Sequence, residues 1–314
     1  MKPYAFGVDI GGTAIKLGLF HTDGTLIEKW QIPTRTEEKG RLILPDALTS
    51  IQEAMKRRAI PWGAIEGVGM GVPGPVGDDG TVLRCVNLGW DVLNVPRTVL
   101  TLEPRLWNVR AANDVNAAAL GELWRGGARG RHSAFLVTLG TGVGGGLVVN
   151  ERIVNGSHGG AGEIGHFCVE ADETERCSCG GHGCLEQYCS ATGLLRLAKK
   201  ALAENPDTVS IMKERAVLTA KDVCDAAKVG DALALELLDR LGQRLGWALT
   251  AVAGTAAPEV FVIGGGLSNA GKILLEKIEF YYRKYAFHAF RHTPLALAEL
   301  GNDAGIYGCV RMLL

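Results

Sequence analysis

The chain has 314 residues, an apolar fraction of 47% and a formal net charge of −1. This length allows a full hydrophobic core and predicts two lobes. The balanced charge excludes the strongly basic face of a nucleic-acid-binding protein, and no apolar run reaches the roughly 20 residues that a membrane-spanning helix needs.

The termini and cysteines indicate the compartment. A strand pattern begins at Tyr4 with no basic segment and apolar stretch before it, so we expect no signal peptide. The eight cysteines could form disulfides only if half of them abandoned the clustered spacing seen below. We therefore expect reduced thiols and a cytoplasmic protein.

The first element is a hairpin with a glycine turn. Residues 4–10 and 14–20 read as paired strands, and Gly11, Gly12 and Thr13 form the turn between them. Backbone N–H groups in such a turn can bind phosphate oxygens, and Asp9 beside them can hold a hydrated Mg²⁺. Alternatively, Asp9 is a turn-capping residue of an ordinary hairpin.

A second candidate acid lies at a strand-to-helix junction. The pattern predicts a strand at 106–112, then Asn113-Asp114, then a helix at 115–124. Ligand-facing groups of α/β folds stand outside the carboxyl ends of strands, where Asp114 falls. On this segment alone, however, helix capping is the simpler role for Asp114.

The third feature is another strand, glycine loop and strand, at 134–149. Gly140, Gly142 and Gly145 match G-x-G-x-x-G, but a dinucleotide fingerprint needs a helix after the loop, and β-branched residues follow here. The loop therefore repeats the first hairpin. Two such turns facing each other could cradle a polyphosphate, which indicates an internal duplication.

A cysteine-rich loop follows, flanked by the carboxylates of Glu163 and Glu186. Its thiolates and imidazoles favour Zn²⁺, and four protein ligands would make the ion structural. One such set is His166, Cys177, Cys179 and Cys184. His182 could replace His166, and the cysteines could instead be buried reduced thiols, although Gly and small polar neighbours do not form a core face.

Helical patterns dominate the rest of the chain. Thr219 and Asp222 form the start of a capping box, and Gly264, Gly265 and Gly266 precede a helix, where a flat ring or phosphate can approach the backbone closely. The other predicted strands cover 25–32, 66–72, 259–263 and 294–300, and the other predicted helices cover 46–59, 189–204, 231–256, 268–283 and a closing segment.

These motifs together resemble the ROK family of sugar kinases, and within it the bacterial glucokinases. The resemblance runs nearly end to end and rests on D-I-G-G-T at 9–13, G-V-P-G-P at 71–75, N-D at 113–114, L-G-T-G-V-G-G-G at 139–146, G-E-I-G-H at 162–166 and C-x-C-G-x-x-G-C-x-E at 177–186. One departure is Ala112, where relatives often have an acidic residue; it leaves Asn113 and Asp114 intact.

The resemblance implies an actin-like, hexokinase-like α/β fold with two RNase H-like lobes around a cleft and a zinc-binding loop. We expect an N-terminal lobe at 1–118, completed by 302–314, and a second lobe at 119–301. The family pattern makes Asp114 the general base, makes Asn113, Glu163, His166 and Glu186 sugar ligands together with Asp114, and assigns zinc to His166 with the three cysteines.

The implied reaction is ATP-dependent phosphorylation of glucose at its 6-hydroxyl, with Mg²⁺ as cofactor. Nucleotide contacts are expected from the three glycine segments, namely Gly11, Gly12 and Thr13; Gly140, Thr141 and Gly142; and Gly264 to Gly266. Partners would be sugar and nucleotide, without nucleic acid or membrane, in a homodimer or homotetramer.

Three alternatives remain open at this point. The same chemistry could act on another sugar, such as N-acetylmannosamine, N-acetylglucosamine, fructose or allose. Polyphosphate could be the donor, although such relatives usually lack the cysteine loop. A sugar-responsive repressor would carry a helix-turn-helix domain ahead of the phosphate turn, where only eight residues precede Asp9.

Overall fold

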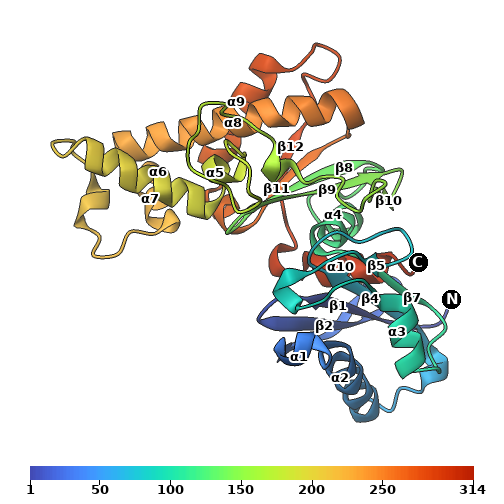
Figure 1. The fold of residues 1–314 in the computed structure, drawn as a ribbon. Coiled ribbons are helices and arrows are strands. Elements are labelled where there is room, and N and C mark those ends of the chain that lie inside the picture. The colour runs from blue at the N-terminus through green and yellow to red at the C-terminus, as the bar shows by residue number, and fades with distance from the viewer. The chain divides into compact units, whose positions relative to one another are not determined.

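The computed structural model describes residues 1–314. Two five-stranded mixed sheets form its framework (Figure 1). The first sheet has the order β3-β2-β1-β4-β7; its strands are β1 (Tyr4–Ile10), β2 (Ala14–His21), β3 (Leu26–Pro33), β4 (Ile65–Val72) and β7 (Val109–Asn113). β2 is antiparallel to both of its neighbours, β1 and β3. The strands β1, β4 and β7 run parallel to one another.

The second sheet repeats this plan with the order β10-β9-β8-β11-β12. Its strands are β8 (Ala134–Leu139), β9 (Val143–Val149), β10 (Arg152–Ile153), β11 (Phe261–Gly264) and β12 (Leu295–Leu297). β8, β11 and β12 are parallel, and β9 and β10 form an antiparallel hairpin. The repeated order agrees with an internal duplication. A strand follows the loop at Gly140, so that loop is not a dinucleotide fingerprint.

The helices vary widely in length. The α-helices are α1 (Glu37–Gly40), α2 (Ile43–Arg57), α3 (Val95–Leu102), α4 (Asp114–Arg125), α5 (Glu186–Cys189), α6 (Ala191–Glu204), α7 (Ala220–Lys228), α8 (Ala232–Ala256), α9 (Lys272–Tyr285) and α10 (Ala304–Arg311). Short 3₁₀ helices are η1 (Trp62–Ala64), η2 (Val86–Leu88), η3 (Ile164–His166), η4 (Ile211–Glu214), η5 (Gly266–Ala270) and η6 (Gly301–Asp303); a two-stranded ribbon joins β5 (Thr81–Val82) to β6 (Leu93–Asn94). None of the helices combines the length and apolar character that a membrane span requires.

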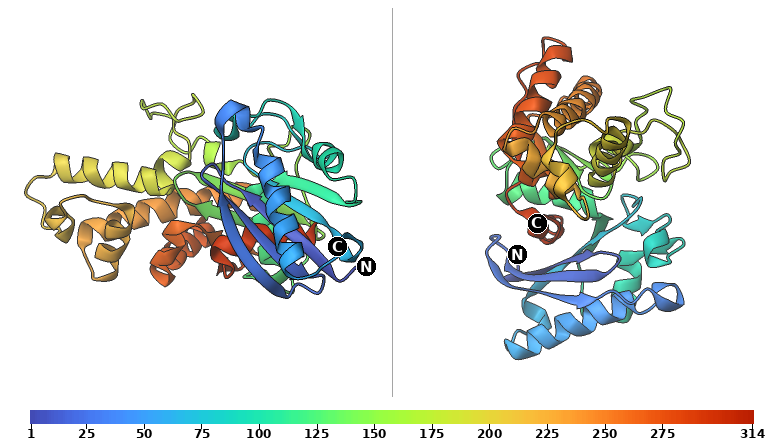
Figure 2. Two further views of the ribbon diagram at one scale, coloured as in Figure 1. Left: turned by 90° about the horizontal axis from the view of Figure 1, so that it is seen from below. Right: turned by 90° about the vertical axis from the view of Figure 1, so that its left-hand side faces the viewer.

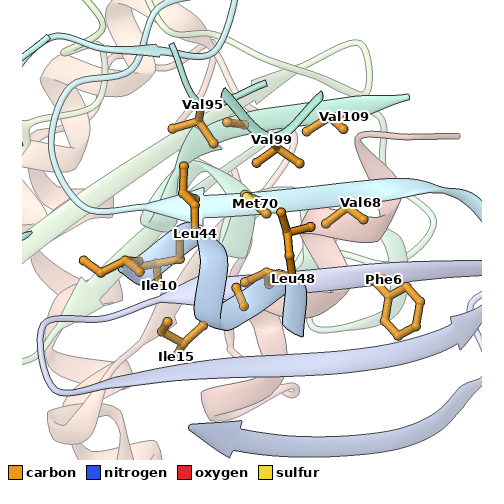
Figure 3. Close-up of a cluster of buried hydrophobic side chains, with 14 of the residues drawn as sticks. Phe6, Ile10, Ile15, Leu44, Leu48, Val68, Met70, Val95, Val99 and Val109 are labelled. Carbon is orange, nitrogen blue, oxygen red and sulfur yellow. The ribbon is translucent and has the colours of Figure 1, made fainter. Parts of the chain in front are cut away.

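Helices α2 and α3 cover one face of the first sheet. Leu44 and Leu48 of α2 point onto the strands beside Met70, and Val99 of α3 completes the cluster (Figure 3). Apolar residues at helical spacing produce this buried stripe. α2 begins three residues before the predicted start because Pro45 is tolerated in the first turn.

Helix α10 covers the other face of the first sheet, and α4 packs on α10 (Figure 2). Glycines make this packing unusually close: a Cβ at Gly69 of β4 would lie 1.8 Å from Cys309 O, and one at Gly308 would lie 1.6 Å from Ala117 O. Only glycine permits backbones to approach this closely. The carboxyl-terminal helix is therefore part of the first sheet's core.

The long helices α8 and α9 lie side by side in the other half of the chain (Figure 1). Gly242 and Gly246 of α8 allow the contact, because a Cβ at either position would come within 2.8 Å of α9 atoms. The predicted capping box of α7 is confirmed, with Thr219 and Asp222 satisfying each other's backbone N–H groups.

The chain separates into two compact units. The first comprises 1–134, 146–162 and 299–314, and the second comprises 135–145 and 163–298. We predicted a division at residue 118, but α4 extends beyond it and is packed on α10. Segment 146–162 also groups with α4, since a Cβ at Gly146 would lie 2.6 Å from Val115 O.

Several predicted elements need correction. The strand predicted at 106–112 begins at Val109, where pairing with Val68 of β4 begins, and the predicted strand at 294–300 is only Leu295–Leu297. The helix predicted at 268–283 is divided into η5 and α9 by Gly271, whose φ is +73°. Helix α3 was not predicted, although Asn94 caps it and Pro96 stands in its first turn.

Candidate active site

Asp9 lies at the end of β1, opposite Lys16 of β2. The Asp9 Oδ2 to Lys16 Nζ distance is 3.6 Å, and Lys16 Nζ also donates to the carbonyl oxygen of Asn302 at 3.3 Å. Asp9 thus forms an ion pair with the neighbouring strand, whereas the alternative reading had it capping the turn. Lys16 connects the hairpin acid to the segment that precedes α10.

Two glycines surround the Asp9 carboxylate. Gly71 of β4 is its register partner, and a Cβ there would lie 3.5 Å from Asp9 Oδ1 and from the Asp114 Cα. Gly305 of α10 is closer, since its Cβ would lie 2.8 Å from Asp9 Cγ. A side chain at Gly305 would displace the carboxylate, whereas a Cβ at Gly71 would make an ordinary contact with it, so Gly305 fixes where the charge lies.

Asn113, rather than Asp114, caps helix α4. Its Oδ1 accepts from the backbone N–H groups of Val115 at 2.9 Å and Asn116 at 3.1 Å, and its Nδ2 donates to the Gly74 carbonyl at 3.0 Å. Asp114 is the first residue of the helix, and its Oδ1 accepts from Val115 N–H at 2.9 Å. The capping role predicted as the alternative for Asp114 thus falls to its neighbour.

Burial controls the charge of both acids. It raises the pKa of Asp9 to about 6, with Lys16 acting in the opposite direction and Asp114 adding to the rise. Burial also raises the pKa of Asp114, against the effect of its backbone hydrogen bonds. Carboxyls with raised pKa values in one place are suited to proton transfer or to binding a cation.

The turn beside Asp9 is open to solvent. Gly11 N–H donates to Ala14 O at 3.0 Å and Thr34 Oγ1 donates to Gly11 O at 2.6 Å, which holds the turn. Gly12 and Thr13 are exposed, and a Cβ at Gly12 would meet no atom within 4 Å. Room for a phosphate therefore exists where the sequence predicted it.

The second glycine loop lies between β8 and β9 in the other unit. Gly140 N–H donates to Gly142 O at 3.0 Å, and Ala191 N–H donates to Gly140 O at 2.8 Å. Thr141 is exposed at the tip. Gly142 packs against Glu186, whose Oε2 would lie 2.7 Å from a Cβ at that position.

Glu186, the first residue of α5, is held by the cysteine-rich loop. Its Oε1 accepts from Ser178 Oγ at 2.7 Å and lies 3.1 Å from Cys177 Sγ. These contacts fix one carboxylate oxygen and direct the side chain toward Gly142. Ser178 was not predicted as a site residue, and only its place between two cysteines could have indicated it.

Glu163 and His166 flank the short helix η3. Gly165 between them packs directly on β9, since a Cβ there would lie 2.1 Å from Val143 O. His166 N–H donates to Glu163 O at 3.3 Å. Both side chains are exposed, so they can contact a ligand or a metal.

The four predicted zinc ligands come together. Donor atoms of His166, Cys177, Cys179 and Cys184 all lie within 4.8 Å of one another. Cys177 Sγ is 3.8 Å from His166 Nδ1, and Cys179 Sγ is 3.6 Å from Cys184 Sγ. A tetrahedral ion with Zn–S bonds of about 2.3 Å separates its ligand atoms by about 3.8 Å, so the set fits zinc.

This geometry distinguishes between the two candidate histidines. His166 is in the cluster, whereas His182 pairs with Arg176 across the loop. All eight cysteines are free thiols, and the three in the cluster are arranged as a ligand set rather than dispersed in a core. A closed set of four leaves no open position, which is typical of a structural ion.

The base of the loop has a second anchor around Tyr188. The ring lies 4.3 Å from the Arg244 guanidinium and 5.5 Å from that of Arg196, and its hydroxyl donates to Glu173 at 2.6 Å. That hydrogen bond is the largest cause that lowers the pKa of Glu173 to about 2. Loop and helices are therefore joined independently of a metal.

The third glycine segment follows β11. Gly265 has φ +83°, and a Cβ there would lie 2.5 Å from Leu139 N, so its role is close packing. Gly264 also packs, with its Cβ position 3.1 Å from Ala298 Cβ. Gly266 begins η5 with no atom near its Cβ position, and it is exposed together with Gly265.

Comparison with known proteins decides the family. The ROK family model matches residues 5–314. This chain belongs to the ROK family. Membership agrees with the α/β fold and its two mixed sheets, and it explains the motifs found in both halves of the chain. The chain is a sugar kinase, a phosphotransferase whose acceptor is an alcohol group.

Three relatives illustrate the range of the family. A glucokinase of Halalkalibacterium halodurans is 40% identical over 306 residues, covering 96% of this chain and 92% of the relative. The crystal structure of a ROK family glucokinase from Streptomyces griseus with glucose and AMPPNP has a TM-score of 0.77, 30% identity and 98% coverage of each chain. An N-acetylgalactosamine kinase of Shewanella is 30% identical over 311 residues, covering 96% of this chain and 94% of the relative.

Proposed function

We propose that this ROK kinase transfers the γ-phosphoryl group of ATP to the 6-hydroxyl of glucose. The observation that carries the mechanism is Asp114: it is half-buried, has a raised pKa, and is relieved of helix capping by Asn113. The choice of glucose rests on the 40% identical glucokinase, and the choice of ATP on the AMPPNP complex of the Streptomyces relative.

In this mechanism the Asp114 carboxylate accepts the proton of the 6-hydroxyl. The hydroxyl oxygen then attacks the γ-phosphorus, the bond to the β,γ-bridging oxygen breaks, and ADP and glucose 6-phosphate result. Phosphoryl transfer requires mainly positioning and charge stabilisation from the protein. The rigid junction between β7 and α4 positions the base.

The glycine segments would provide backbone donors for the nucleotide. We assign phosphate contacts to Gly11, Gly12 and Thr13 and to the loop at Gly140–Gly142, and a nucleotide contact to Gly266. Asp9 would hold Mg²⁺, which supplies charge stabilisation of the phosphates when bound. The neighbouring Asp114 charge favours a cation near Asp9.

The sugar hydroxyls would be bound by Glu163, His166 and Glu186, with Asn113 supplying the second hydrogen of its amide. A carboxylate can accept from two hydroxyls at once. A structural zinc on His166, Cys177, Cys179 and Cys184 would fix the loop behind Glu186. Zinc binding requires reduced cysteines, which fits a cytoplasmic protein.

An N-acetylated hexose is the second candidate substrate, because the Shewanella relative is named for N-acetylgalactosamine. The test is ATP-dependent turnover, compared by kcat/KM, on glucose, mannose, fructose, allose, N-acetylglucosamine, N-acetylmannosamine and N-acetylgalactosamine. Preference for glucose supports the proposal. Preference for an N-acetylated sugar would overturn the substrate while leaving the assigned base in place.

Asp114→Asn tests the base independently. We expect turnover to fall by at least about 10³-fold while sugar still binds, because shape is kept and proton acceptance is lost. Glucose binding is measured by calorimetry on the same variant. Near wild-type turnover would remove Asp114 from the mechanism.

A further inference from the structure

Cys168 differs from the other seven cysteines in its surroundings. Cys168 and Cys179 are exposed, and the remaining six are buried. Cys179 belongs to the proposed zinc ligands, so Cys168 is the single exposed thiol outside that set. An exposed thiol that no metal holds is the one that an oxidant in solution reaches first.

Cys168 lies directly across from Cys184, one of the proposed zinc ligands. The two residues form an antiparallel pair. Backbone hydrogen bonds flank this pair, from Leu185 N–H to Phe167 O at 2.8 Å and from Val169 N–H to Gly183 O at 2.7 Å. The Cys184 N–H donates instead to the side chain of Gln187 at 3.0 Å. Cys168 and Cys184 are therefore a non-hydrogen-bonded pair, the type in which opposing side chains lie closest together.

This pairing brings the two cysteines within the range of a disulfide. The Cα atoms of a non-hydrogen-bonded pair are about 4.5 Å apart, and a disulfide joins Cα atoms that are about 4.4–6.8 Å apart. Directly opposed side chains also lie on one face of the paired segments. Rotation of the two side chains about their Cα–Cβ bonds can therefore join the sulfurs while the backbone stays in place.

A bond to Cys168 and a bond to zinc require the same sulfur of Cys184. Cys184 Sγ lies 3.6 Å from Cys179 Sγ, and all four donor atoms of the ligand set lie within 4.8 Å of one another. Zinc is bound by the thiolate form of cysteine. A sulfur that is bonded to Cys168 is no longer a thiolate, so the set of four is incomplete and binds the ion more weakly.

We propose that Cys168 and Cys184 are a redox pair, and that hydrogen peroxide joins them in a disulfide that withdraws Cys184 from the proposed zinc site. In the first step the Cys168 thiol is oxidised to a sulfenic acid, and the peroxide is reduced to one water. The Cys184 sulfur then attacks the Cys168 sulfur and the S–O bond breaks. The hydroxide that leaves takes a proton from solvent and becomes a second water, so one peroxide accepts the two electrons.

The base of the loop has contacts that do not depend on the metal. The Tyr188 hydroxyl donates to Glu173 at 2.6 Å, and Arg244 lies 2.9 Å from Glu170. The disulfide would also join two segments that are already paired. The oxidised loop therefore keeps its framework, and a dithiol can reduce it to a form that binds zinc again.

Loss of zinc would change the surroundings of Glu186. Glu186 Oε1 lies 2.7 Å from Ser178 Oγ and 3.1 Å from Cys177 Sγ. Without the ion, residues 177–179 lose the bonds that fix them, and the carboxylate loses fixed partners. Oxidation should therefore raise KM for glucose. This consequence rests on the proposed function, in which Glu186 binds the sugar, whereas the thiol chemistry does not.

The first test is oxidation of the full-length, zinc-loaded protein by hydrogen peroxide. We expect zinc release, followed with a metal-binding dye, together with a disulfide that joins the tryptic peptides 153–176 and 177–196. Fragmentation of the joined peptides by mass spectrometry should assign the bond to Cys168 and Cys184, and dithiothreitol with added zinc should restore the metal. The absence of a bond between the two peptides would overturn the proposal.

The second test uses variants. Cys168→Ser should hold zinc but release it at least about tenfold more slowly in peroxide, because the exposed thiol that reacts first is missing. Cys224→Ala is the matched control, since it removes a buried thiol of α7 and should release zinc as the wild type does. Melting temperatures of the reduced proteins confirm that both variants are folded. Release from Cys168→Ser at the wild-type rate would overturn the proposal.

The two proposals can fail separately. A reduced wild-type protein without zinc would contradict the proposed metal site, while a mapped bond between Cys168 and Cys184 would still support the thiol pair. Zinc in the reduced protein without that bond after oxidation would support the metal site and contradict the pair.

Discussion

Gly305 packs closely on the carboxylate of Asp9, because a Cβ at this position would lie 2.8 Å from Asp9 Cγ and 2.9 Å from Oδ2. The two residues are 296 positions apart in sequence. The carboxyl-terminal helix therefore forms part of the wall around the acid that we assign to Mg²⁺. The packing of α10 on β1 therefore also completes the surroundings of Asp9.

Gly305→Ala should therefore impair both catalysis and folding. The new methyl group must displace Asp9 or α10, and a shift near 1 Å can lower turnover by about 100-fold, while overpacking costs about 1–3 kcal/mol. Steady-state kinetics and urea unfolding measure the two effects. Gly63→Ala is the control, because a Cβ there meets no atom within 4 Å. Wild-type turnover in Gly305→Ala would show that Asp9 need not be held at this position.

The half-buried acid Asp114 predicts opposite effects on activity and stability. Its pKa in the folded protein is raised above the ordinary 3.8 by burial. The native state therefore holds this proton more tightly, so the contribution of Asp114 to stability is fully present below pH 3.8 and is lost as pH rises through the raised pKa. As a base, Asp114 must be ionised, so kcat/KM should fall as pH drops through the same value.

Asp114→Asn should consequently raise the melting temperature at pH 8 and change it little near pH 4. Thermal unfolding at both pH values, beside the pH profile of wild-type kcat/KM, provides the measurement. Asp78→Asn is a matched control, since it makes the same change at an exposed acid of the same unit. A destabilised Asp114→Asn at pH 8 would contradict the assignment of an unfavourable buried charge.

The sequence predicted the repeated hairpins, both glycine turns and the three clustered cysteines because these depend on local patterns, whereas the choice of His166 over His182 came from the family resemblance. Strand periodicity, turn glycines and cysteine spacing are all readable within a few residues. It could not assign helix capping between Asn113 and Asp114, since both residues are good caps and only the backbone geometry separates them. It also missed Lys16, Ser178 and Gly305, whose roles depend on partners brought together by folding.

The zinc assignment predicts a difference between two neighbouring cysteines. Cys179→Ser should lose the metal and melt at a lower temperature, because thiolate ligation contributes to folding free energy. Cys168→Ser should keep the metal, since Cys168 lies on the same loop but outside the ligand cluster. Elemental analysis of both purified variants measures this. Equal zinc content in Cys179→Ser and wild type would exclude the site.

Glu122 of α4 holds the segment that leads into α10. Its carboxylate is 1% exposed and accepts three backbone N–H groups: Gly127 at 2.7 Å, Glu299 at 3.0 Å and Leu300 at 2.9 Å. Residues 299 and 300 lead directly into the segment that holds Asn302, the acceptor of Lys16, and Gly305.

Glu122→Gln keeps the shape but replaces one acceptor oxygen with a donor, which then faces a backbone N–H. We expect a loss of about 2–4 kcal/mol in unfolding free energy, from a broken charge-assisted bond and an unsatisfied buried donor. Turnover should fall as well, because the segment against Asp9 loses its anchor. Urea unfolding and kinetics test this against Glu53→Gln, an exposed glutamate of α2. If both variants unfold alike, the three hydrogen bonds do not stabilise this connection, and the positioning of Asp9 must come from the glycine contacts alone.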